Sequence, residues 1–280
     1  MKKHIYIKWL WAFPLVIYAV DANAWGLYTH IFFSQWLLMT TPLLDPKIQQ
    51  AVKKFPKLVL AGACLPDLAV ISKKFNTTHK WEKAALMIQS ARSDEEIAIA
   101  IGYNSHLFVD VIAHNHFVPA HEAKWDNESM TTHIGSEWAM DAHIAKHTPH
   151  CPHHLILTHI DILTEFVHPH FDVSKKVVRS KLRLLAWLDG LLRVSQLATC
   201  ILWTAKVFDR QLTKDFDYYL TKTSHALTHF ESSTFGNRPS WEAEQKRLEA
   251  AEMDAWREQC LRDLSTRLAT PINYHHANSA

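Results

Sequence analysis

Histidine and carboxylate side chains recur at helical spacing in the first half of this 280-residue chain. His106, Asp110 and His114 stand at positions i, i+4 and i+8, so each lies about 40° around a helix from the previous one. His133 and Glu137 repeat the i, i+4 pair further along. Imidazole nitrogens and carboxylate oxygens are common zinc ligands. The spacing therefore predicts two helices that each present metal ligands on one face.

The number of histidines makes chance pairs a real alternative, because the chain contains 20 of them. Two such pairs on apolar segments favour a metal site over coincidence. His116 complicates the first group, since it lies about 80° away from His106 if the helix continues. Pro119 disfavours helical geometry in the preceding residue, so the helix is expected to end near Asn115, and His116 could then fold back as a ligand. Spacing favours His114 and keeps His116 as the alternate.

The elements that carry these residues are predicted to be helices, because the sustained alternation of apolar and polar residues typical of strands is missing. Ser93 to Glu96 forms a capping box and predicts a helix through about Ala113. Asp45 followed by Pro46 predicts a second helix start.

Apolar residues also recur at helical spacing from Ser174 to Trp203, and again after Ser240. Both stretches are predicted to form scaffold helices. We therefore predict a single all-α domain over residues 25–270 with a C-terminal tail at 271–280.

The first 24 residues have the pattern of a secretory signal peptide. Met1–Lys8 is cationic, and the apolar run Trp9–Val20 is too short to span a membrane comfortably. Ala22-Asn23-Ala24 supplies the small-x-small cleavage pattern. Cleavage after Ala24 is expected to leave Trp25 as the first residue of a protein in the periplasm or outside the cell.

Charge and cysteine content narrow the class of protein. The formal net charge of the chain is +2. Residues 1–24 carry three lysines and one aspartate, which account for this +2, so residues 25–280 have a formal net charge of zero. This argues against a protein that binds polyanions by counterion release. The four cysteines permit disulfides in an exported protein, with three possible pairings. No CxxC pair occurs, which argues against a cysteine zinc site.

With these residues in place, the chain resembles the zinc-dependent phospholipase C family, a helical superfamily shared with single-strand nucleases and the glycosylphosphatidylinositol-specific phospholipase D. The matching segments, in chain order, are Trp25-Gly26, Thr29-His30, Ala61–Asp67, Thr78–Trp81, His106–Asp110 and His133–Glu137. Each segment alone is a weak signal. Their shared order, with a tryptophan at the predicted cleavage point, is specific.

The resemblance implies three zinc ions, held by ligands at the matching positions. The implied sets are Asp67, His79, His106 and Asp110 for one ion; His114 or His116 with His133 and Glu137 for another; and the amine and carbonyl of Trp25 with His30 and bridging Asp110 for the third. Asp67 would also orient the attacking water or accept its proton. Family branches place a histidine either four or six residues after the aspartate, and this chain has both.

The favoured interpretation is a secreted zinc-dependent phospholipase C that hydrolyses the phosphodiester of phospholipid headgroups with zinc-activated water. Its expected partners are phospholipid substrate and, peripherally, a membrane surface, with no nucleic acid. The first alternative is a single-strand nuclease on the same fold, although Glu137 matches the phospholipases where nucleases carry aspartate. The second is a non-catalytic zinc-binding protein of the envelope, which the histidine content supports and the ordered carboxylates oppose.

Two further features carry expectations about packing. Four tryptophans near the motifs could line a lipid cleft, but helical spacing favours core positions for Trp36, Trp81, Trp125 and Trp138. Gly135 lies between the two ligands of the later helix, where glycine costs about 1 kcal/mol. Its presence predicts close backbone approach to the site or a packing contact.

Overall fold

The computed structural model describes residues 26–40, 45–125, 130–234, 239, 241–243, 249–270 and 272. The predicted signal peptide, Trp25 and nearly all of the predicted C-terminal tail lie outside these ranges. Every regular element within them is helical, which confirms the predicted all-α fold.

The elements follow one another as a series of helices with short connections. They are α2 (Leu27–Thr40), α3 (Pro46–Lys54), α4 (Pro56–Gly62), α5 (Leu68–Ile71), the 3-10 turn η1 (Lys73–Phe75), α6 (Trp81–Ser90), α7 (Asp94–Ile112), the π-helical turn η2 (Ala113–Phe117), α8 (Val118–Lys124), α9 (Met130–Ala145), α10 (Pro152–Thr158), α11 (Ile160–Val167), the 3-10 turn η3 (His168–His170), α12 (Lys175–Val194), α13 (Leu197–Phe208), α14 (Leu212–Leu227), α15 (Phe230–Thr234) and α16 (Ala250–Thr266).

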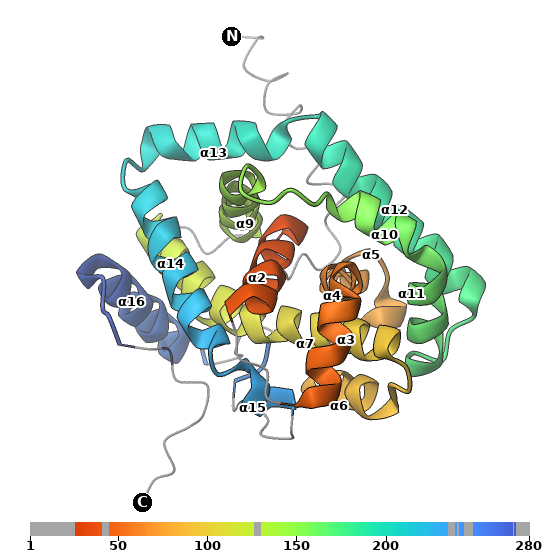
Figure 1. Ribbon diagram of the computed structural model, residues 1–280. Helices are drawn as coiled ribbons and strands as arrows, with labels where there is room; N and C mark the ends of the chain where they lie inside the picture. Colours follow the sequence, from red (N-terminus) through yellow and green to blue (C-terminus); the bar gives the residue numbers. More distant parts are fainter. Residues whose placement is uncertain are drawn as a thin grey trace, which may run out of the picture.

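Helix α7 crosses the middle of the molecule and contacts α2, α3, α4 and α6 (Figure 1). All residues from Ala98 to Ile112 are buried. The continuous helical stretch Asp94–Lys124, formed by α7, η2 and α8, is long and apolar enough to cross a membrane. However, 94% of its most apolar 18-residue segment is buried inside the protein. Its apolar character is therefore that of a core helix.

Helices α4 and α7 approach until their backbones touch, and glycine makes this possible. A Cβ atom on Gly102 would lie 1.9 Å from the carbonyl oxygen of Val59, and one on Gly62 would lie 2.3 Å from the carbonyl oxygen of Ile99. Real side chains do not fit at such distances. This approach brings Asp67, which follows α4, close to the ligand face of α7.

Three of the predicted helix starts are confirmed by their caps. The Ser93 hydroxyl accepts a hydrogen bond from the Glu96 amide at 3.2 Å, and the Asp45 carboxylate accepts two from the first turn of α3. Ser174 caps α12. These side chains satisfy amides that have no partner inside the helix. The start predicted at Ser240 is wrong, because Trp241–Ala243 is not helical, but the helix itself is present as α16 from Ala250.

The predicted end of the central helix near Asn115 is also wrong, because the chain stays helical through α8. The π turn accommodates Pro119: the amide of Val118 donates to the carbonyl of Ala113, one residue further back than in an α-helix. Proline cannot donate to the Asn115 carbonyl, which instead accepts from the indole nitrogen of Trp256 at 2.7 Å. His114 and His116 lie inside this turn, so they point in other directions than they would in a continuous α-helix.

Helices α12 and α13 form an arch along the outer edge of the molecule (Figure 1). They meet at 52°, and together they also pass the length and hydropathy test for a membrane span. Gln196, between them, adopts a left-handed conformation with φ of 55°. The predicted continuous stretch from Ser174 to Trp203 is therefore two helices, of which α12 packs on α10 and α11 and α13 packs on α9.

Two glycine substitutions should have opposite effects on stability. Gly102→Ala is expected to lower the free energy of unfolding by about 3 kcal/mol, because α4 and α7 must separate. A Cβ atom on Gly135 would meet no atom of the described residues within 4 Å, so both explanations for this glycine are wrong. Gly135→Ala should raise the free energy of unfolding by about 1 kcal/mol. Urea unfolding of both variants measures these changes, and destabilisation by Gly135→Ala would contradict the open space.

Candidate metal centre

Buried histidines and carboxylates converge where α2, α7, α9 and the segments after α4 and η1 meet. Within each of three groups, the ligand atoms lie within 4.8 Å of one another. The groups are His30, His106 and Asp110; Asp67, His79 and His106; and His114, His133 and Glu137. Two groups share His106, and His114 of the third group lies 3.9 Å from Asp110, so the three groups adjoin one another.

The side chain of Asp110 lies at the middle of this centre and is completely buried. Its oxygens lie 2.9 Å from Nε2 of His106, 3.3 Å from Nε2 of His30 and 3.4 Å from Nε2 of His79. Nε2 of His114 follows at 3.9 Å. Burial alone would raise the pKa of Asp110, but the His106 and His30 imidazoles hold that pKa well below its usual range. Asp110 therefore stays ionised and joins the groups.

Hydrogen bonds fix which nitrogen of His106 and His79 faces the centre. Nδ1 of His106 lies 2.7 Å from the carbonyl oxygen of Ala63, which only accepts, so this nitrogen carries the proton. The Thr78 hydroxyl donates to the carbonyl of Pro66 at 2.6 Å and lies 3.3 Å from Nδ1 of His79. Because its proton is used, Thr78 accepts from His79. In its neutral form each ring therefore turns an Nε2 lone pair toward the centre, and in its protonated form it places a positive charge there beside Asp110.

In the neutral form of both rings, the two Nε2 lone pairs face each other at 3.3 Å, with no proton of their own between them. Oδ1 of Asp67 lies 3.7 Å from Nε2 of His106 and has no hydrogen-bond partner among the described residues. Such a buried arrangement of acceptors repels itself unless a cation lies among them. These residues therefore fit a metal ion.

The third group has the same character. His114 has no hydrogen-bond partner at either ring nitrogen within the described chain, and burial lowers its pKa to about 3, so its ring is neutral. Oε1 of Glu137 lies 3.8 Å from Nδ1 of His114 and 3.1 Å from Nε2 of His133. Burial raises the pKa of Glu137 to about 7. A neutral imidazole and a buried carboxylate are suited to zinc.

His116 points elsewhere. Its ring packs against Trp241 and Trp256, with centroid distances of 5.5 and 5.4 Å, and belongs to none of the three groups. Burial lowers its pKa to about 4, so it is a neutral ring in an aromatic environment. The π turn thus brings His114, rather than His116, to His133 and Glu137.

Asp141 positions the start of α2, a role that its sequence context did not reveal. Its carboxylate is buried, accepts from the Thr29 amide at 2.8 Å and from the Thr29 hydroxyl at 3.0 Å, and pairs with Arg193 of α12. A Cβ atom on Gly26 would lie 2.3 Å from this carboxylate. Asp141 lies one turn after Glu137, which hinted at a role near the centre. Arg193 carried no such signal.

A cluster of histidines around Cys151, the four cysteines and the four tryptophans named above contribute no ligand to the three groups. The histidines beside Cys151 belong to no metal-binding group found in the described residues, and His153 lies 3.6 Å from Asp189. All four cysteines are free. Trp81 and Trp138 are buried, while Trp36 and Trp125 are partly buried against the core, as helical spacing predicted.

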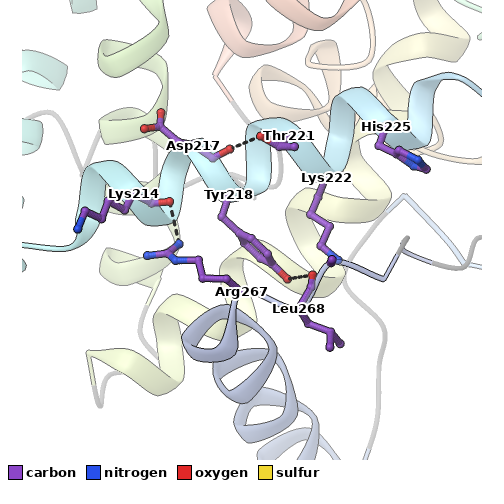
Figure 2. Close-up of a pocket in the computed structure, with 9 residues that line it drawn as sticks. Lys214, Asp217, Tyr218, Thr221, Lys222, His225, Arg267 and Leu268 are labelled. Atoms are coloured by element: carbon purple, nitrogen blue, oxygen red, sulfur yellow. Dashed lines mark hydrogen bonds between the residues drawn. The ribbon is translucent and has the colours of Figure 1, made fainter.

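A cavity of about 440 Å³ lies between α14 and the end of α16, and none of the predicted ligands lines it (Figure 2). Two of its three cations are engaged: Lys222 donates to the Thr270 carbonyl, and Arg267 pairs with Asp215. The cavity is therefore separate from the metal centre.

The fold and this centre define a helical protein with clustered histidine and carboxylate ligands. The family model described as zinc dependent phospholipase C matches residues 29–190, more than half of the chain. The chain belongs to this family, as the ordered motifs predicted. The matched segment includes every member of the three groups. Searches of curated proteins and of solved structures each return no match.

Replacing Asp67 should reveal the cost of its burial in zinc-free protein. Burial raises the pKa of Asp67 to about 7, above its value in the unfolded chain. Its contribution to stability is therefore fully present below about pH 4 and is lost as the pH rises through 7. Asp67→Asn, which does not titrate, should exceed the zinc-free native protein in free energy of unfolding at pH 8 by up to about 4 kcal/mol.

Urea unfolding in chelator at pH 4 and pH 8 measures this difference. It should nearly disappear at pH 4, because Asp67 is then uncharged in the folded protein and about half protonated in the unfolded chain, while histidine protonation is common to both proteins. Glu137→Gln is a second test of the same effect. It should show the same dependence on pH, since the pKa of Glu137 is also raised to about 7. A difference independent of pH would contradict the effect of burial on the pKa of these carboxyl groups.

Proposed function

We propose that this protein is a secreted phospholipase C that hydrolyses the phosphodiester between diacylglycerol and a phospholipid headgroup. The observation that supports it best is the set of three buried ligand groups linked through Asp110 and His106. Membership of the zinc-dependent phospholipase C family supports the same activity. Single ligand groups occur in structural sites, whereas a linked cluster is typical of phosphoester hydrolysis.

We assign the ligand residues to three zinc ions by their distances from one another. Asp67, His79, His106 and Asp110 would hold one; His114, His133 and Glu137 a second; and His30 and Asp110, with the amine and carbonyl of Trp25, a third. When bound, zinc ions would neutralise the phosphate oxygens and lower the pKa of a water molecule toward ~7.

Asp67 is the proposed catalytic carboxylate. Its Oδ1 has no hydrogen-bond partner in the described chain and lies 3.7 Å from Nε2 of His106. The oxygens of Asp110 also lack a hydrogen bond among these residues, but they lie closer, at 2.9 to 3.4 Å, to three imidazoles. A free carboxylate oxygen at this point can orient the attacking water or accept its proton. Ala63 and Thr78 hold the neighbouring imidazoles, so Asp67 acts against fixed partners. Burial excludes bulk water and strengthens these interactions.

Secretion is part of this proposal because the third site requires a free amino group at Trp25. Trp25 lies outside the described residues, but its neighbour Gly26 packs against Asp141, and the Gly26 carbonyl accepts from the Thr29 amide at 2.9 Å. This anchors the chain one residue after the proposed cleavage point. An α-amino group has an ordinary pKa of about 7.7–8.0, so a metal can hold it deprotonated at neutral pH.

Product analysis on mixed phospholipid micelles tests the proposed activity. Zinc-loaded protein beginning at Trp25 should release diacylglycerol and phosphorylated headgroups, and Asp67→Asn should lower turnover by about 10²-fold or more. Release of phosphatidic acid would instead indicate cleavage on the other side of the phosphate. Nucleotide release from single-stranded DNA alone would establish a nuclease, and inactivity with metal bound would favour a zinc-binding protein.

Metal analysis distinguishes the two candidate histidines. His114→Ala should lose one zinc per chain, because the group with His133 and Glu137 then lacks a ligand. His116→Phe should keep all zinc ions, since a phenyl ring can replace the imidazole between Trp241 and Trp256. Loss of zinc in the His116 variant, with full zinc in the His114 variant, would reverse the assignment.

A further inference from the structure

We propose that the outer faces of α12 and α13 form a docking surface for an anionic phospholipid bilayer, which rests on the proposed function in that the substrate is a membrane lipid. The surface, here called the outer ridge, consists of large apolar side chains that are exposed. They are Leu184, Trp187, Leu191, Val194, Trp203, Val207 and Phe208. Exposed tryptophan, leucine and phenylalanine side chains are typical of interfacial helices.

The apolar residues of α12 lie on one stripe. Leu184, Trp187, Leu191 and Val194 follow one another at intervals of three and four residues, within about 100° of the helix circumference. The residues that α12 buries, such as Leu182 and Leu185, lie on the opposite side. This helix is thus apolar on two faces, and only one faces the core. An amphipathic scaffold helix requires one.

Exposure of the ridge is high where its aromatic residues stand. Trp187 is 61% exposed, Trp203 is 73% exposed and Phe208 is 86% exposed. The tryptophans near the metal motifs, by contrast, are buried or partly buried in the core. Large apolar side chains that stay exposed together on a helix face indicate a contact surface. Tryptophan in particular favours the boundary between water and lipid.

The charges around the ridge select an anionic partner. From Lys175 to Phe208 the only acidic residue is Asp189, which is buried and pairs with Arg193. Lys176, Arg183 and Lys206 are basic residues of the same two helices. Arg183 lies one turn before Trp187, so a cation and an aromatic ring share one face. Cations beside apolar side chains complement anionic headgroups above an acyl layer.

A second copy of the chain fits this surface poorly. The segment carries seven basic residues. Lys175, Arg179 and Arg193 pair with Glu165, Asp161 and Asp141, which leaves Lys176, Lys181, Arg183 and Lys206 as its unpaired cations among the described residues. Two copies face to face would bring these like charges together, which opposes association. A bilayer containing anionic lipid has the opposite sign.

The ridge lies directly outside the helices that carry the metal centre. The inner side of α13 packs through Ala198 on Ile134 and Trp138 of α9, the neighbours of His133 and Glu137. At the bend between α12 and α13, Arg193 stacks on Tyr28 of α2. It also pairs with Asp141 of α9, which holds the start of α2. Figure 1 shows this arch running along the outside of α9 and α2. A protein docked on the ridge would hold its metal centre near the lipid surface.

Vesicle sedimentation with the protein beginning at Trp25 tests the docking surface. The double variant Trp187→Ser and Trp203→Ser should bind vesicles of phosphatidylcholine and phosphatidylglycerol in equal amounts at least tenfold more weakly than the native protein. Arg183→Glu should weaken binding to these vesicles, and added salt should do the same. Met39→Ser, which changes a residue on α2 that is 76% exposed, is the matched control and should bind as the native protein does.

The outcomes separate docking from catalysis. Hydrolysis of a soluble phosphodiester without acyl chains should be unchanged in the double variant, while hydrolysis of vesicle lipid should fall with binding. Native-like vesicle binding by the double variant would overturn the docking surface, whatever the activity. A native dimer that the same substitutions dissociate would also overturn it. Vesicle binding that depends on the ridge, without any hydrolysis of lipid, would support the docking surface and contradict the proposed phospholipase activity.

Discussion

A carboxylate buried without any exposure is the constraint on which the rest of this structure depends. Removing the charge of Asp110 from water costs several kcal/mol unless partners surround it. Here the partners are imidazoles from three separate segments, at 2.9 to 3.4 Å. Helix α2, the turn before α6 and helix α7 must therefore meet at one point. The same requirement makes Asp110 the group through which the ligand sets are joined.

The scaffold meets this requirement through close packing rather than through long loops. Gly62 and Gly102 allow α4 and α7 to touch backbone to backbone, which puts the Ala63 carbonyl against the His106 ring. The π turn then places His114 on the side of α9. Each of these is a backbone feature buried in the core, so the ligands stand on rigid elements. Preorganised ligands hold a metal and its water without further rearrangement.

The metal centre is connected to the molecular surface by two short routes. Asp141 links α9 to the start of α2 and, through Arg193, to the bend of the outer arch. The second route runs from His133 and Glu137 through their neighbours in α9 to α13. An arch that contacts both α2 and α9 has little freedom to move independently of the ligands. A surface that binds lipid and a centre that cleaves it would in this way be held in a fixed relation.

Local chemistry determined much of this protein from the sequence alone. Helix starts at Asp45, Ser93 and Ser174 follow from capping, and the spacing of His106 and Asp110 fixes a shared face, because both depend on residues within one or two turns. The ordered motifs also identified the family. The predicted ligand roles rest on those motifs and on proximity.

Contacts between distant segments decided what the sequence left open or predicted wrongly. The choice of His114 over His116 depends on the π turn that precedes Pro119. Trp256 of α16 stabilises this turn by donating to the carbonyl of Asn115. The role of Asp141 depends on Thr29 and Arg193, far away in sequence. The exposure of Trp187 and Trp203 depends on which side of the arch finds a partner. Periodicity shows that a helix has an apolar face, but only tertiary packing decides whether that face is covered.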